Sequence, residues 1–206
     1  MKFLIFLFIL PCCLFGQESI EVRVQPYLLP SKHCLKPLLD EIFSQGRITE
    51  TYETFERVGF VTHCRRRLSG VTIARHPKIP GYLFKVYLDS ETIQKRSKPG
   101  EEWLLQRCIG AAKIRALIKK KKMRYFLVPD KWLYELPQKG YILITTDMEL
   151  VSNRETKTAW KTNVNRELLQ ELYSILRHGY GSPTLSANIP YTKSGKFAFI
   201  DTEYPE

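Results

Sequence analysis

One long helical pattern lies between two groups of short β-rich segments, and this order constrains the fold more than any other feature of the chain. Apolar and small residues recur at helical intervals through residues 101–119. The strand-like segments are residues 56–63, 71–74, 82–88, 125–128, 132–134 and 141–145. Since an amphipathic helix must bury its apolar face, the pattern predicts that residues 101–119 pack on a sheet built from these strands.

The strand that contains Lys85 presents two different faces. Its apolar face carries Tyr82, Phe84, Val86 and Leu88. Because side chains alternate along a strand, Lys85 points to the opposite, partly apolar surface. A lysine on a half-buried strand usually keeps its charge at the surface and its stem over apolar area. A functional role for Lys85 therefore depends on what surrounds it.

The chain on either side of this central part is less regular. Residues 20–24 alternate like a short strand, and residues 35–43 have the spacing of a short helix. Residues 147–163 are polar and are expected to join a β-rich front part to a smaller helical back part. In that back part, Asn165 is expected to cap a helix, and a hairpin is expected over residues 189–200. The apolar residues of the helix are Leu168, Leu169, Leu172, Ile175 and Leu176.

The N-terminus has the order of an export signal. An apolar run at residues 3–10 follows a lysine, and polar sequence begins at Gln17. The run is too short to cross a bilayer as a helix. We therefore expect residues 1–16 to be a signal peptide and the remaining chain to be exported, to the periplasm or outside the cell. Lipid attachment at Cys12 or Cys13 is the alternative.

Three cysteines lie after the signal: Cys34, Cys64 and Cys108. They lack the paired spacing of a zinc site. An odd number also permits at most one disulfide within the chain. Packing must therefore supply most of the stability.

The formal net charge of +11 favours acidic partners. Phosphorylated ligands, anionic lipid and nucleic acid all meet this description, with nucleic acid the least favoured. The densest cluster of cations is residues 119–122 with Arg124. Cations at the C-terminal end of a helix complement its dipole, so this cluster is explained either by a solvated helix end or by a polyanion-binding patch.

The order of elements over residues 55–204 resembles that of protein kinases and kinase-like small-molecule phosphotransferases. Lys85, in the sequence Phe-Lys-Val-Tyr, resembles the lysine of the third kinase strand, which holds the nucleotide phosphates. Glu101 or Glu102, at the start of the following helix, resembles the ion-pair partner of that lysine. The resemblance thus implies a nucleotide site around these residues.

The same resemblance extends to the C-terminal residues. Asn188 and Asp201, thirteen residues apart across the expected hairpin, resemble the two magnesium ligands of kinases. The sequence Ile-Asp-Thr-Glu at residues 200–203 is similar to the corresponding motif of choline-kinase-like and aminoglycoside-kinase-like enzymes. Asp147 would follow the last sheet strand, at the hinge that contacts adenine. ATP and Mg²⁺ are the implied cofactors.

The fold implied by the resemblance is α+β. Its kinase-like N-lobe, residues 55–148, would contain an antiparallel sheet of about five strands with one packed helix. Residues 149–206 would form a minimal, truncated C-lobe with one helix and a β-hairpin. Residues 17–54 would be an N-terminal extension.

Three departures from the kinase pattern bear on catalysis. Kinases place a catalytic aspartate five residues before the metal-binding asparagine, and here that position is Pro183, which cannot act as a base. The turn at residues 64–70 contains three arginines and lacks the glycine pattern of a kinase phosphate loop. The sequence also ends at Glu206, before the helices that bind the phosphate acceptor in such enzymes.

The leading hypothesis is therefore an exported, kinase-like module that binds or scaffolds without catalysis. It would retain affinity for a nucleotide or another phosphorylated or anionic ligand, or bind a partner protein. One alternative is an atypical phosphotransferase that acts on a small molecule or a protein. The other is a basic extracytoplasmic domain that binds polyanions through residues 119–124.

Overall fold

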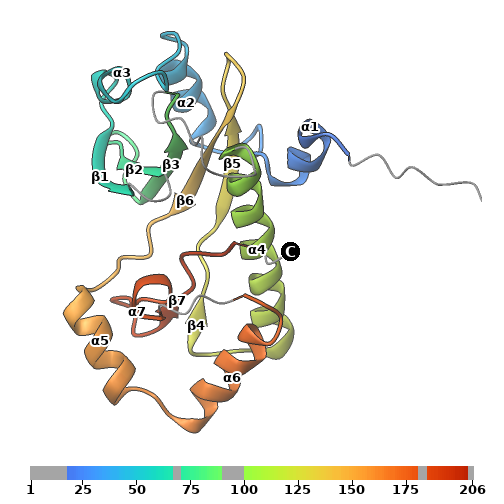
Figure 1. Cartoon of the computed structure of the whole chain (residues 1–206), viewed down its shortest axis with the longest axis vertical. Coiled ribbons are helices and arrows are strands. Elements are labelled where there is room, and N and C mark those ends of the chain that lie inside the picture. The colour runs from blue at the N-terminus through green and yellow to red at the C-terminus, as the bar shows by residue number, and fades with distance from the viewer. Residues whose placement is uncertain (1–17, 67–70, 90–99, 181–184, 204–206) are drawn as a thin grey trace, which may run out of the picture.

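A five-stranded sheet forms the front of the molecule in a computed structural model that describes residues 18–66, 71–89, 100–180 and 185–203 (Figure 1). The strand order is β1-β2-β3-β6-β5, and every pairing is antiparallel. The strands are β1 (Val61–Arg66), β2 (Val71–Arg75), β3 (Tyr82–Tyr87), β5 (Lys131–Glu135) and β6 (Tyr141–Thr146). The predicted α+β class with an antiparallel sheet of five strands is confirmed.

One face of the sheet is covered by α2 (Lys36–Phe43) and α3 (Tyr52–Arg57). Phe84 and Val86 of β3 are buried on this face, as the alternation of β3 predicts. The aromatic rings of Phe55 and Phe60 stack at a centroid distance of 4.1 Å in the same core. The front lobe thus contains a continuous apolar layer between the sheet and two short helices.

The opposite face carries α4 (Gly100–Lys121), which is the long helix predicted from periodicity. Its Leu104, Leu105 and Cys108 pack on Leu133 and Leu143 of the sheet. Burial raises the pKa of the Cys108 thiol to about 12, so the side chain packs as a neutral group at ordinary pH.

A back lobe surrounds the C-terminal half of α4. It contains the short strands β4 (Phe126–Leu127) and β7 (Phe197–Ala198), which pair in parallel. Figure 1 shows it on the far side of α4 from α1, below the sheet. Its helices are α5 (Asn153–Thr162), α6 (Arg166–Leu176) and α7 (Leu185–Asn188). Its core joins Ile114 of α4 to the aromatic residues of β4 and β7.

Five local predictions need correction. Residues 125–128, expected in the main sheet, instead contribute β4 to the two-stranded sheet of the back lobe. Two other corrections concern helices in the front lobe. Residues 20–24 form a helix, α1 (Ile20–Val24), and not a strand. Ile20 and Val24 lie four residues apart and turn toward the core, whereas Val22 is exposed, so the pattern was helical. The strand expected from residue 56 begins at Val61, because a capping box at Thr51 starts α3 and buries Phe55.

The other two corrections concern the back lobe. The polar residues 147–163 contain a helix, α5, which begins with a capping box between Ser152 and Glu155. The expected hairpin is mostly irregular: Tyr191 and Phe197 form an isolated antiparallel bridge, and Phe197 pairs in parallel with Phe126. The cap predicted at Asn165 is confirmed, since its side chain accepts a hydrogen bond from the Leu168 amide.

The export signal predicted at residues 1–16 lies outside the described residues, and so does Pro183. Cys34 and Cys108 are free thiols, exposed and buried respectively. No helix in the described part of the chain has both the length and the apolar character needed to cross a membrane.

Candidate functional site

Two buried cations from two elements contact the last described segment of the chain, and a third cation, Lys85, lies on the same sheet face as one of them. Lys85 lies on β3, on the sheet face that α4 covers, because it pairs with Leu143 across the strands. Lys131 begins β5 and points to the same face. Arg107 comes from α4. We call these residues, with Asp201 and Glu203, the cation–carboxylate cluster.

Lys131 is buried, with 6% of its surface exposed. Its Nζ donates hydrogen bonds to the Ile200 carbonyl at 2.9 Å and to the Thr202 hydroxyl at 2.6 Å. Burial, reinforced by the positive charge of Lys85, holds the pKa of Lys131 well below its ordinary value, although Asp201 opposes this shift. The lysine therefore anchors the C-terminal segment at a considerable electrostatic cost.

Arg107 binds both carboxylates of the C-terminal segment. Its guanidinium donates to Glu203 Oε1 at 2.8 Å and to the Tyr87 hydroxyl at 3.2 Å, and its Nε lies 3.5 Å from Asp201 Oδ1. Burial disfavours the charge of Arg107, but Tyr87, Asp201 and Glu203 outweigh it and raise its pKa. The Thr202 hydroxyl also donates to the Arg107 carbonyl at 2.6 Å. Helix α4 thus holds this segment through side chain and backbone.

The backbone brings Asn188 next to the segment that contains Asp201. The Ile200 amide donates to the Asn188 carbonyl at 3.1 Å. The guanidinium of Arg107 lies against Asp201 and Glu203, the carboxylates that Mg²⁺ would need. In the described ranges, no group of three or more His, Cys, Asp or Glu residues is placed to hold a metal ion. Their role as metal ligands stays a prediction.

The two glutamates at the start of α4 differ in their surroundings. Glu102 accepts two hydrogen bonds from the Arg23 guanidinium of α1, at 2.7 and 2.9 Å. Glu101 is partly buried, and burial, followed by the nearby charge of Glu21, raises its pKa. The Arg23–Glu102 pair attaches α1 to the N-terminal end of α4. The ion pair predicted between Lys85 and one of the glutamates stays a prediction.

Asp147 lies just after β6, where the chain leaves the sheet for the back lobe. Its carboxylate pairs with the Arg75 guanidinium at 2.6 Å, and its amide donates to the Gly81 carbonyl at 2.8 Å. Arg75 also contacts His63 Nε2 at 2.7 Å. The residue predicted to meet adenine therefore has a clear structural role, which links the end of β2 to the interlobe connection.

Sequence reasoning missed Arg107 and Lys131. A signal for each was present. Arg107 lies three residues after Leu104 and one before Cys108, on the buried face of an amphipathic helix, where an unpaired cation is costly. Lys131 shares its strand face with Leu133 by simple alternation. A charge at a core position of a periodic pattern indicates a specific partner elsewhere in the chain.

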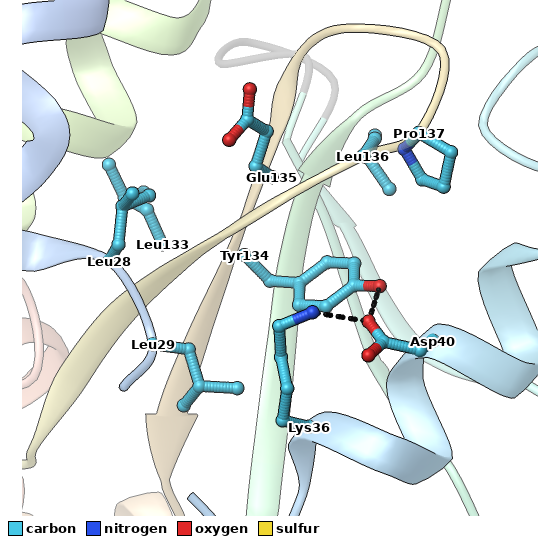
Figure 2. Close-up of a pocket in the computed structure, with 9 residues that line it drawn as sticks. All are labelled: Leu28, Leu29, Lys36, Asp40, Leu133, Tyr134, Glu135, Leu136 and Pro137. Carbon is cyan, nitrogen blue, oxygen red and sulfur yellow. Dashed lines mark hydrogen bonds and ion pairs between the residues drawn. The ribbon is translucent and has the colours of Figure 1, made fainter. Parts of the chain in front are cut away.

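A separate pocket of about 360 Å³ lies beside the edge strand β5 (Figure 2). In Figure 2 the Lys36 ammonium and the Tyr134 hydroxyl converge on Asp40. The Tyr134 hydroxyl donates to Asp40 Oδ1 at 2.7 Å, and the Lys36 ammonium lies 5.1 Å from the centre of the Tyr134 ring. This network fastens α2 to the sheet.

Comparisons with known proteins give a weak likeness of fold. No protein-family model matches the sequence, and no curated protein is similar to it. The crystal structure of the kinase domain of PknI from M. tuberculosis is similar with a TM-score of 0.34 and 10% sequence identity. The match covers 72% of this chain and 59% of the PknI kinase domain. At this TM-score it carries no argument about function.

Proposed function

We propose that this protein is a kinase-like module that binds an anionic, phosphate-bearing ligand and does not transfer phosphate. The observation that carries the proposal is Arg107, a buried cation of α4 that binds the two carboxylates nearest the site. Phosphoryl transfer needs carboxylates that are free to hold magnesium. Here one guanidinium pairs with both carboxylates.

The electrostatics around Lys131 support an anionic ligand. Burial, followed by the positive charge of Lys85, lowers the pKa of Lys131. An anion bound at Lys85 would offset the repulsion between the two lysines. A phosphate group is suited to such a site, because it accepts several charge-assisted hydrogen bonds. The ligand class is therefore a nucleotide or another phosphorylated molecule.

Export is part of the proposal and is supported by the apolar run at residues 3–10. N-terminal sequencing of the protein recovered from outside the cytoplasm tests it directly. The expected N-terminus is near Gln17, and an intact Met1 in a cytoplasmic fraction would contradict export.

A thermal-shift titration tests ligand binding. ATP and inorganic phosphate, each with and without magnesium, are expected to raise the melting temperature, and magnesium is expected to add little. Lys85→Ala should abolish the shift, whereas Lys78→Ala, which removes an exposed lysine of the β2–β3 connection, should leave it unchanged. No shift in the parent chain would remove the proposed binding function.

The effect of Asp201→Asn on ligand affinity distinguishes an anion site from a kinase site, because the two predict changes of opposite sign. If Arg107 is released from a carboxylate, phosphate should bind as tightly or more tightly. If Asp201 instead holds magnesium, ATP binding should weaken and its dependence on magnesium should disappear. Transfer of labelled phosphate that requires Asp201 would establish the phosphotransferase alternative in place of our proposal.

A further inference from the structure

Most of the net positive charge belongs to the back lobe. Residues 113–129 and 149–206 contain 14 Lys and Arg and 7 Asp and Glu, a net formal charge of +7. The rest of the sequence contains 18 Lys and Arg and 14 Asp and Glu, a net charge of +4. A field of one sign on one lobe favours an extended anionic partner over scattered small ions.

The acidic residues of the back lobe are used within its own structure. Glu155 belongs to the capping box of α5. Glu167 accepts a hydrogen bond from the Arg124 guanidinium, and Glu171 accepts hydrogen bonds from the amides of Arg124 and Tyr125. Glu167 and Glu171 thus pair with groups of the connection between α4 and β4.

The outer side of α6 combines cations with exposed apolar groups. Leu168, Leu172 and Ile175 are buried in the back-lobe core. Residues 166, 169, 173 and 177 are spaced three and four positions apart, so their side chains form a stripe on the side of α6 that faces away from this core. Leu169 and Tyr173 there are 51% and 67% exposed.

Arginines flank this apolar pair, and the end of α4 lies beside it. Arg166 and Arg177, at the two ends of α6, are both exposed. The Lys121 ammonium of α4 donates to the Ser174 hydroxyl at 3.2 Å. The members of the resulting surface, which we call the basic face of α6, are Lys121, Arg166, Leu169, Tyr173 and Arg177.

We propose that the basic face of α6 docks the protein on an anionic lipid bilayer. Lysine and arginine close to such a surface are attracted by its negative potential. Leu169 gains by leaving water for the boundary between headgroups and acyl chains, and Tyr173 suits the interface because it has an apolar ring and a polar hydroxyl. A nucleic acid would use the cations and could stack on Tyr173, but it offers Leu169 no comparable apolar layer. The observations thus favour lipid.

Co-sedimentation with vesicles tests the proposal with the full chain. Vesicles of phosphatidylcholine alone are compared with vesicles that also contain phosphatidylserine. We expect binding to the anionic vesicles, weakened by salt. Arg166→Gln and Arg177→Gln should each weaken binding about fivefold, and the double variant Leu169→Ser with Tyr173→Ser should also weaken it. All variants share the same residues 3–10, so any contribution of that apolar run is common to them.

Matched controls come from the front lobe. Lys78→Gln removes one exposed cation, and Val61→Ser removes an apolar side chain that is 52% exposed, as Leu169 is 51% exposed. Both should bind like the parent chain. A Tyr173→Trp variant should show a blue shift of tryptophan emission with anionic vesicles, measured against the parent chain as background.

Three results would overturn the proposal. One is equal binding to neutral and anionic vesicles, and another is unchanged binding in the double variant Arg166→Gln with Arg177→Gln. The third is tighter binding of a single-stranded oligonucleotide that displaces the protein from vesicles, which would assign the basic face of α6 to nucleic acid.

Discussion

The front and back lobes share α4 but differ in how they are built and charged. The front lobe packs two apolar layers on a five-stranded sheet, whereas the back lobe surrounds a two-stranded parallel pair with helices. The front lobe and its flanking segments carry a net formal charge of +4, and the smaller back lobe carries +7. The buried charges that make specific contacts therefore lie in a different part of the molecule from most of the charges that produce its long-range electrostatic field.

The joint between the lobes is where the two charge patterns meet. Lys131 and Arg107 hold the C-terminal segment by hydrogen bonds, so that the last residues of the back lobe are attached to the front-lobe sheet and to α4. Changes in the two cores, in the joint and in the helix caps therefore probe whether the lobes behave as one unit.

The largest effects are expected from matched truncations in the two cores. Phe84→Ala in the front lobe and Phe197→Ala in the back lobe should each cost about 3–5 kcal/mol, since both rings are buried. Because α4 contributes buried residues to both lobes, we expect a single unfolding transition in each variant. Urea unfolding followed by fluorescence and circular dichroism measures this. Two separate transitions in Phe197→Ala would show that the lobes unfold independently.

Arg107→Met should have the next largest effect. It leaves Asp201 and Glu203 together without their cation, and we expect a loss of about 2–3 kcal/mol, below the usual cost of breaking a buried pair because both carboxylates are more than one third exposed. Arg115→Met is the control in the same helix, since that arginine pairs with Asp130 at the surface and should cost less than about 1 kcal/mol. Equal losses of stability in Arg107→Met and Arg115→Met would show that the contacts of Arg107 with the C-terminal segment add no special stability.

Lys131→Met should change how stability depends on pH. The pKa of Lys131 in the folded protein lies well below its ordinary value of 10.5. Between the folded and unfolded pKa values, the unfolded chain binds the extra proton, so this group makes stability rise with pH. Its contribution is at most about 1.4 kcal/mol per pH unit.

The measurement is the free energy of unfolding of both chains from neutral pH to pH 10. The parent chain should gain stability relative to Lys131→Met as the pH rises. Parallel curves would show that the lysine titrates normally in the folded protein.

The helix caps should give the smallest effects and compare the lobes directly. Thr51→Ala removes the capping box of α3 in the front lobe, and Ser152→Ala removes that of α5 in the back lobe. Each should cost about 1 kcal/mol in chemical denaturation. If only one variant loses stability, the helix whose cap can be removed without loss does not unfold together with the rest of the molecule.

Local sequence patterns predicted the parts of the fold that depend on neighbouring residues. The faces of β3, the long helix α4 and the Asn165 cap all follow from alternation, periodicity and capping chemistry. The same reasoning should have found α5, because Ser152 and Glu155 have the spacing of a capping box. The five residues of α1 were too few to distinguish a strand from a helix by alternation alone.

Local sequence patterns could not predict contacts between residues that lie far apart in the sequence. The contact of Arg107 with Glu203 spans 96 residues, and that of Lys131 with Thr202 spans 71. Only a short connection separates Asn188 from Ile200, whose amide donates to the Asn188 carbonyl. Sequence spacing could not reveal that Asp201 would meet an arginine from α4, since that encounter depends on how the two lobes pack.

The parallel pairing of β4 with β7 also has a consequence for the timing of folding. Phe126 pairs with Phe197, so the back-lobe core closes only after a long stretch of chain has been made and ordered. Contacts of such high sequence separation slow folding, and apolar surface stays exposed in the meantime. The front-lobe sheet closes at β6, near residue 146. During synthesis, the exposed aromatic residues of the unfinished back lobe would therefore be the natural target of a chaperone.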